Sequence, residues 1–169
     1  MRRIIVLTLL IISCFLLQTT VFPYFELVGI VPNILLILTM SFGLMRGRRE
    51  GLLVGFFCGL LFDIFFGFAI GPHALIYMYL GYCNGFFHRH YAVEDILLPA
   101  IAIGVNDLIY NLLIYLIFFL MRNRLDFLTY ATHTILPEMV YTILVTLFLY
   151  KIFVVINRWL RVKVDGGKK

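Results

Sequence analysis

Charged residues are scarce in this sequence. Only 14% of the 169 residues are Asp, Glu, Lys or Arg, whereas 63% are hydrophobic. A soluble domain carries about 25% charged and about 45–50% apolar residues. The composition therefore excludes an ordinary soluble protein and predicts an integral membrane protein that lies in the lipid bilayer. Because one span needs about 20 apolar residues, we expect a single transmembrane domain over residues 1–169 with several spans.

Motifs of recognised chemistry are also missing. Cys14, Cys58 and Cys83 form no C-x-x-C pair, and the sequence has no H-E-x-x-H, nucleophile elbow or phosphate-binding loop. The pair His88 and His90 is better explained as a basic cap at a helix end than as a metal site. The net charge of +5 comes from basic residues at the ends of apolar runs, where membrane topology explains them better than nucleic acid does. We therefore expect no enzyme activity, no catalytic or metal-binding residues, no cofactor and no nucleic acid partner.

Six apolar runs, separated by proline, glycine or charged clusters, predict an all-α protein with six transmembrane helices. Pro23 is expected to end the first helix, and Pro137 is expected to lie inside the last. The predicted spans cover about residues 4–22, 33–45, 51–70, 73–87, 96–121 and 131–156. If the N-terminus is cytoplasmic, most arginines and lysines face inward and only Arg122 and Arg124 face outward, which predicts that both termini are cytoplasmic. An arrangement with fewer spans is the alternative.

The third predicted span begins at a basic segment and continues as a stripe of glycines spaced four residues apart. In lipid, such a stripe lets another helix backbone approach closely. It therefore serves either packing within the protein, which we favour, or contact with a partner protein. The residues concerned are Arg46, Arg48, Arg49, Gly51, Gly55 and Gly59.

Polar side chains within the predicted spans are the other candidates for function. Asp63, Asp107 and Glu138 are carboxyls inside apolar runs, where each costs roughly 2.5–3.5 kcal/mol and needs a partner or a cavity. Asn111 shares a helix face with Asp107 at i,i+4. One hypothesis is a polar cavity that opens outward, is lined by Asp63, His73 and Glu138, and binds a small ligand or relays protons. The other, which we favour because no arginine or lysine lies deep enough to complement a substrate, is a set of hydrogen bonds between helices.

The order and spacing of several short segments resemble the rod shape-determining protein MreD family of the bacterial cell-wall elongation machinery. The resemblance is most specific between residues 17 and 85. It rests on Leu17-Gln18-Thr19-Thr20, Pro32-Asn33, the segment Gly43-Leu44-Met45-Arg46-Gly47-Arg48-Arg49-Glu50-Gly51, the segment from Gly55 to Asp63, Gly67, Gly71, Leu75 and Gly81-Tyr82.

This resemblance implies a fold like the substrate-binding S components of energy-coupling-factor transporters. It also implies a non-catalytic scaffold in the bacterial cytoplasmic membrane that helps to maintain rod cell shape. The implied partners are MreC and possibly MreB and the RodA–penicillin-binding-protein 2 synthase. On this view the basic segment and the glycine stripe are candidate contact surfaces.

The alternative function follows from the same implied fold: a true S component that captures a vitamin-like solute for a transporter. Those subunits usually carry Ala-x-x-x-Ala on the first helix. The segment from Ile4 to Ile12 lacks that pattern, which argues against transport.

Overall fold

The computed structural model describes residues 2–25, 30–67, 70–90, 97–122, 132 and 135–165. Within these residues the chain is helical, as predicted, and contains six α-helices and no strand. Most of the predicted loops at residues 88–95 and 122–130 falls in 91–96 and 123–131, which lie outside the described residues. The α-helices are α1 (Arg2–Leu16), α2 (Ile34–Arg46), α3 (Arg48–Phe66), α4 (Pro72–Asn84), α5 (Leu97–Arg122) and α7 (Leu136–Asp165).

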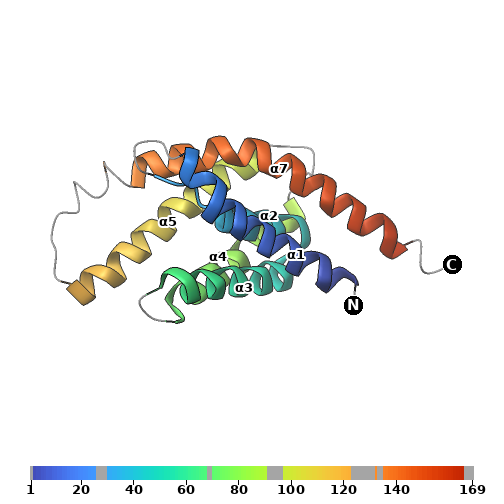
Figure 1. The fold of residues 1–169 in the computed structure, drawn as a ribbon. Coiled ribbons are helices and arrows are strands. Elements are labelled where there is room, and N and C mark those ends of the chain that lie inside the picture. Colours follow the sequence, from blue (N-terminus) through green and yellow to red (C-terminus); the bar gives the residue numbers. More distant parts are fainter. Residues whose placement is uncertain are drawn as a thin grey trace.

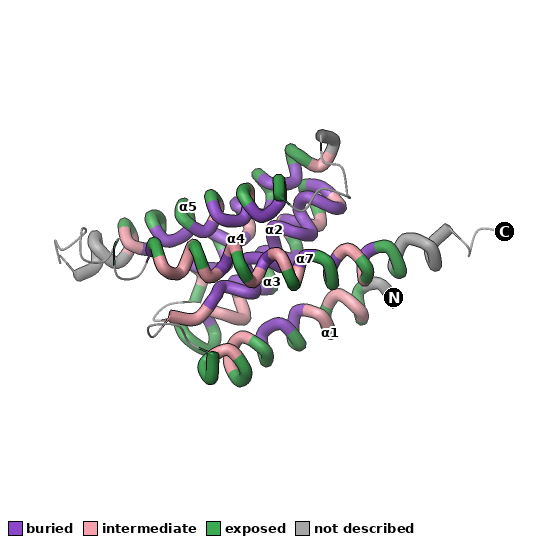
Figure 2. The backbone as a smooth tube through the Cα atoms, turned by 90° about the horizontal axis from the view of Figure 1, so that it is seen from above, coloured by how far each residue is buried: buried purple, intermediate pink, exposed green. Residues whose placement is uncertain are grey.

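Helix α2 is the centre of the bundle. It contacts each of the other five α-helices, and every residue from Ile34 to Met45 is buried. This follows from its sequence, which is apolar on all sides and therefore suits a helix surrounded by protein. Figure 1 shows α7 on one side of α2 and the α3–α4 pair on the other, and Figure 2 shows α2 as buried while the surrounding helices have exposed outer faces.

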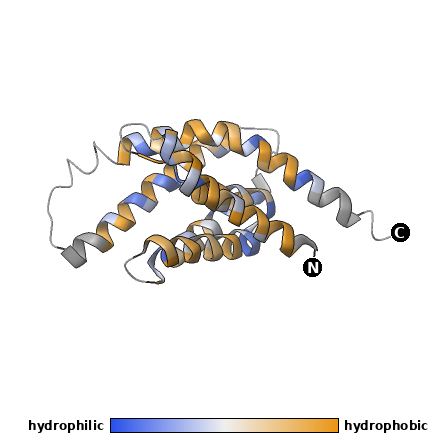
Figure 3. Cartoon of the chain, in the orientation of Figure 1, coloured by the Kyte–Doolittle hydropathy of each residue, from blue (hydrophilic) through white to orange (hydrophobic). Residues whose placement is uncertain are grey.

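The first helical stretch, Ile4–Phe25, extends further than its sequence predicts. The expectation that Pro23 ends it was wrong, because helical turns continue through a π-helical segment (Leu17–Val21) and a 3₁₀ turn (Phe22–Phe25). Pro23 is accommodated because it lies in the first turn of a new helical segment, where its missing N–H group is not required. Most of the outward face of α1 is apolar (Figure 3).

Helices α2, α3 and α4 follow one another through tight corners. Gly47 alone separates α2 from α3, and its φ of +93° is a backbone conformation that favours glycine. Helix α3 ends at Phe66 because Gly67 takes an extended conformation, four residues before the end of the predicted span. Helix α4 begins at Pro72, a favoured residue for a first helical turn.

Helices α5 and α7 are the long elements of the second half of the chain and pack against each other. Pro137 lies in the first turn of α7, so it does not interrupt the helix as its predicted position inside a span would imply. Among the described residues, three helical stretches are long and apolar enough to cross a membrane: Ile4–Phe25, Leu97–Ile117 and Leu136–Trp159. Helix α2 is shorter, because its 13 residues extend over only about 20 Å.

Candidate functional site

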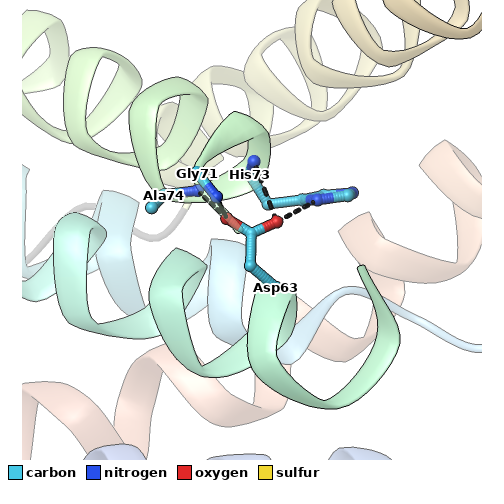
Figure 4. Close-up of polar contacts among 4 residues, drawn as sticks. All are labelled: Asp63, Gly71, His73 and Ala74. Atoms are coloured by element: carbon cyan, nitrogen blue, oxygen red, sulfur yellow. Dashed lines mark hydrogen bonds and ion pairs between the residues drawn. The ribbon is translucent and has the colours of Figure 1, made fainter. Parts of the chain in front are cut away.

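Asp63 closes the corner between α3 and α4. It lies in the last turn of α3, and its buried carboxylate faces the start of α4 (Figure 4). The backbone N–H groups of Gly71 and Ala74 donate to Oδ2 at 2.8 and 3.0 Å, and that of His73 donates to Oδ1 at 3.2 Å. The His73 ring places Nδ1 2.6 Å from Oδ1. Asp63 therefore caps the first turn of α4 from a neighbouring helix and satisfies three N–H groups that a helix start leaves without partners.

The glycine stripe faces α4. A side chain at Gly51 would meet the backbone of Gly81, and one at Gly55 would meet the carbonyl group of Tyr77. One at Gly59 would meet the backbone of His73 and Ala74. The two helices run antiparallel with their backbones in direct contact, a separation that only small residues permit. The stripe is therefore occupied by α4 within this chain.

The three arginines of the basic segment have different environments. The Arg46 side chain is only 7% exposed; its Nε donates to Asn157 on α7, and Nη1 lies 3.4 Å from Oε2 of Glu50. Arg48 and Arg49 are exposed, and the Arg48 guanidinium lies over the Phe86 ring at 3.5 Å. Arg46 thus joins α2 to α3 and α7, whereas Arg48 and Arg49 are available at the surface.

Asp107, Asn111 and Glu138 come together between α5 and α7. Asp107 is fully buried, and neither of its carboxylate oxygens has a hydrogen-bond partner among the described residues. Asn111 donates to the backbone carbonyl of Asp107 at 3.1 Å. Glu138 lies within electrostatic range of Asp107 and lines a cavity of about 310 Å³. Asp107 and Asn111, which their i,i+4 spacing places on one helix face, therefore lie in one polar cluster with Glu138.

The cavity beside Glu138 differs from the one expected from the sequence. Of Asp63, His73 and Glu138, only Glu138 is among its lining residues, because the carboxylate of Asp63 is directed to the start of α4. Tyr110 lies between the Asp63–His73 pair and the cavity. The centroid of its ring is 6.2 Å from that of the His73 ring, and Tyr110 also lines the cavity. The other polar lining groups are Gln18, Thr19 and Asn33.

Sequence reasoning missed the role of Asn33. Its Oδ1 accepts from the backbone N–H of Leu36 at 3.2 Å and from the Tyr77 hydroxyl at 2.7 Å, while its own N–H donates to Thr142 on α7 at 3.4 Å. Gln18 adds a second cap by accepting from the N–H of Leu35. The signal was present, since an Asn directly before an apolar helical run is a typical N-cap.

Several polar side chains of this site support the packing of the helices. Asp63, Asn33 and Gln18 cap the starts of helices, and Arg46 joins neighbouring helices. The carboxylate of Asp63 accepts hydrogen bonds from the start of α4 and lies 2.6 Å from Nδ1 of His73. In the described part of the chain, no group of three His, Cys, Asp or Glu residues is arranged to hold a metal ion.

Comparison with known proteins gives one match. The model of a family described as rod shape-determining protein MreD matches residues 1–158. No curated protein and no solved structure matches the chain.

Proposed function

The chain belongs to the rod shape-determining protein MreD family, and from this premise we propose that it is a non-catalytic scaffold of the bacterial cell-wall elongation complex that binds MreC. Family membership makes it a membrane protein with a role in rod shape determination. The scaffold role, the bacterial cytoplasmic membrane as its location, and MreB and the RodA–penicillin-binding-protein 2 synthase as further partners belong to the proposal.

The observation that supports a scaffold is an apolar groove between α1 and α3. The groove has a volume of about 500 Å³, and Thr8 is its one polar lining residue. Its α3 wall includes Leu53, Phe57 and Ile64, which are all about half exposed. These three residues lie on one face of α3 over about three turns. A helix face with this spacing of apolar residues can pack against another helix. We propose that the membrane helix of MreC lies in this groove.

Two features favour this groove over other surfaces. The glycine stripe, which the sequence offered as a contact surface, is covered by α4. A second apolar groove, between α1 and α7, is wider and more open, with a volume of about 630 Å³. The α1–α3 groove is more enclosed, so a partner helix would gain contacts on both walls, and packing contacts are what drive helix association in lipid.

Purification in mild detergent separates the scaffold from its alternative, an S component of an energy-coupling-factor transporter. The cavity beside Glu138 is the feature that favours the alternative, because it is large enough for a small solute. Co-purification of MreC without a bound solute is the expected result. Co-purification of an energising ATPase, or of a bound small molecule, would replace the scaffold with the transporter.

Disulfide crosslinking tests the proposed groove. In a background without the native cysteines, Phe57→Cys places a thiol in the groove, and Phe148→Cys places one on the exposed face of α7, outside both grooves. We expect Phe57→Cys to crosslink to cysteines scanned along the MreC membrane helix and Phe148→Cys to give no product. Equal products from both positions, or products only from Phe148→Cys, would exclude the groove while leaving the interaction with MreC intact.

A further inference from the structure

A basic cavity lies where α2, α3 and α4 meet. It has a volume of about 420 Å³, and its lining includes Arg46, Arg48, Arg49, His88 and Phe86. No carboxylate is among the described residues that line it. Glu50 lies outside the lining and interacts with Arg46, so Arg46 is partly neutralised, whereas Arg48 and Arg49 have no carboxylate partner among the described residues. A cavity of this composition favours an anion.

Arg48 and His88 are held in place by the fold. The Arg48 guanidinium stacks on the ring of Phe86, and the backbone of Arg48 packs against Gly85. Nδ1 of His88 donates to the carbonyl of Leu44 at 2.7 Å, so this ring is fixed against the end of α2. Guanidinium groups fixed in this way match phosphate oxygens with paired hydrogen bonds. The first turn of α3 at Arg48 adds the positive end of a helix dipole to the same cavity.

An apolar groove adjoins the basic cavity. It has a volume of about 330 Å³ and is lined mainly by Phe87 and by residues of α5, including Leu98, Ile101 and Val105. Phe86 lines the basic cavity while the next residue, Phe87, lines the groove. Leu44, whose carbonyl accepts from His88, lines the groove as well. The basic cavity and the apolar groove thus lie on either side of the short segment that contains Phe86 and Phe87.

We propose that this surface binds an anionic phospholipid, with the phosphate headgroup in the basic cavity and an acyl chain along the groove of Phe87 and α5. Charge complementarity identifies the ligand, because the cavity offers two uncompensated guanidinium groups and the groove offers apolar surface to a hydrocarbon chain. Basic pockets at the cytoplasmic ends of membrane helices bind anionic headgroups by the same physics. The arginines lie at the end of the bundle that the charge asymmetry predicts to be cytoplasmic.

Lipid binding to the full chain in neutral detergent tests the proposal. The probe is short-chain phosphatidylglycerol, measured by native mass spectrometry against phosphatidylcholine of equal chain length. The test variant is Arg48→Gln with Arg49→Gln. The matched control is Arg158→Gln, which removes an exposed charge next to Asn157, the residue that contacts Arg46, but outside the cavity. Thermal unfolding without lipid verifies that all variants are folded.

We expect the wild-type chain to prefer phosphatidylglycerol, the double variant to lose about tenfold to thirtyfold in affinity, and Arg158→Gln to stay within about twofold. Glycerol phosphate, which carries the headgroup without chains, should bind much more weakly than the lipid. Three results would overturn the proposal: no preference over phosphatidylcholine, an equal loss in Arg158→Gln, or glycerol phosphate binding as tightly as the lipid. A double variant that keeps lipid binding but no longer recruits MreB would make the cavity a protein contact instead.

Discussion

Asp63 and Asp107 are both buried aspartates on helices of the same bundle, yet replacing each by asparagine should have different consequences for stability. Both oxygens of Asp63 accept hydrogen bonds, whereas neither oxygen of Asp107 has a partner in the described part of the chain. Asparagine has the same shape as aspartate but only one acceptor oxygen, and its amide nitrogen donates. Comparing the two substitutions therefore distinguishes the stability that comes from hydrogen-bonded capping from the effect of burying a carboxyl group.

The expected loss of stability in Asp63→Asn follows from the N–H donors that lose their acceptor. If the amide oxygen keeps the N–H of His73, the N–H groups of Gly71 and Ala74 face an NH₂ group instead of Oδ2. Each buried donor without a partner costs about 1–3 kcal/mol, and because the Gly71 contact is only partly buried we expect a total of about 2–4 kcal/mol. For a chain of 169 residues that corresponds to a fall in Tm of roughly 5–15 °C. Asp107→Asn replaces a buried carboxyl group whose oxygens accept no hydrogen bond in the described part of the chain, so its Tm should be unchanged or higher.

Differential scanning fluorimetry in one detergent, with both variants and the wild type measured together, gives these shifts. Loss of rod shape in cells that carry only Asp63→Asn would then follow from lower stability and would be no evidence for proton relay. The reasoning is refuted if Asp63→Asn melts with the wild type, or if Asp107→Asn falls as far as Asp63→Asn.

Three further substitutions test the packing. Gly55→Val should force α3 away from the Tyr77 carbonyl and abolish a monodisperse peak in size-exclusion chromatography, while Leu53→Val on the exposed face of the same helix should leave the peak intact. Arg46→Gln should lower stability by about 1–3 kcal/mol because it removes the guanidinium that donates to the buried Asn157 and contacts Glu50, whereas Arg49→Gln should stay within about 0.5 kcal/mol; similar melting of the two would contradict the different environments of these arginines. Asn33→Ala should cost about 2–3 kcal/mol through the lost cap of α2 and the Tyr77 hydrogen bond, and thermal melting unchanged from wild type would exclude that role.

Sequence reasoning predicted the class of the protein and the approximate positions of its helices, because long apolar runs and the breaks between them are local signals. It also identified the glycine stripe on α3, and the structure shows that α4 covers this stripe. The number of membrane crossings and the orientation of the termini stay predictions. The likeness to transporter S components is also still a prediction, since no solved structure matches the chain.

The functions of individual polar residues were harder to predict because they depend on the register between distant segments. Arg46 and Arg49 look equivalent in the sequence, and the contacts of Arg46 with Asn157 on α7 and with Glu50 distinguish them. Asp63 was grouped with Glu138 because both are carboxyls inside apolar runs, but a position within a span does not give the direction of a side chain. The cap of α4 by Asp63 requires the antiparallel α3–α4 register, which spacing within α3 alone cannot supply.

The contacts between α2 and α7 have a consequence for how the protein is made. Asn33 at the start of α2 contacts Thr142, and Arg46 at its end contacts Asn157, so both ends of the central helix depend on residues more than 100 positions later. During synthesis, α2 emerges from the ribosome long before these residues exist. Arg46 and the backbone N–H group of Asn33 must meanwhile be satisfied by water, by headgroups or by the insertion machinery. Assembly of the bundle is therefore completed only after translation has delivered the final helix, and a chain that stops before α7 leaves its own centre unfinished.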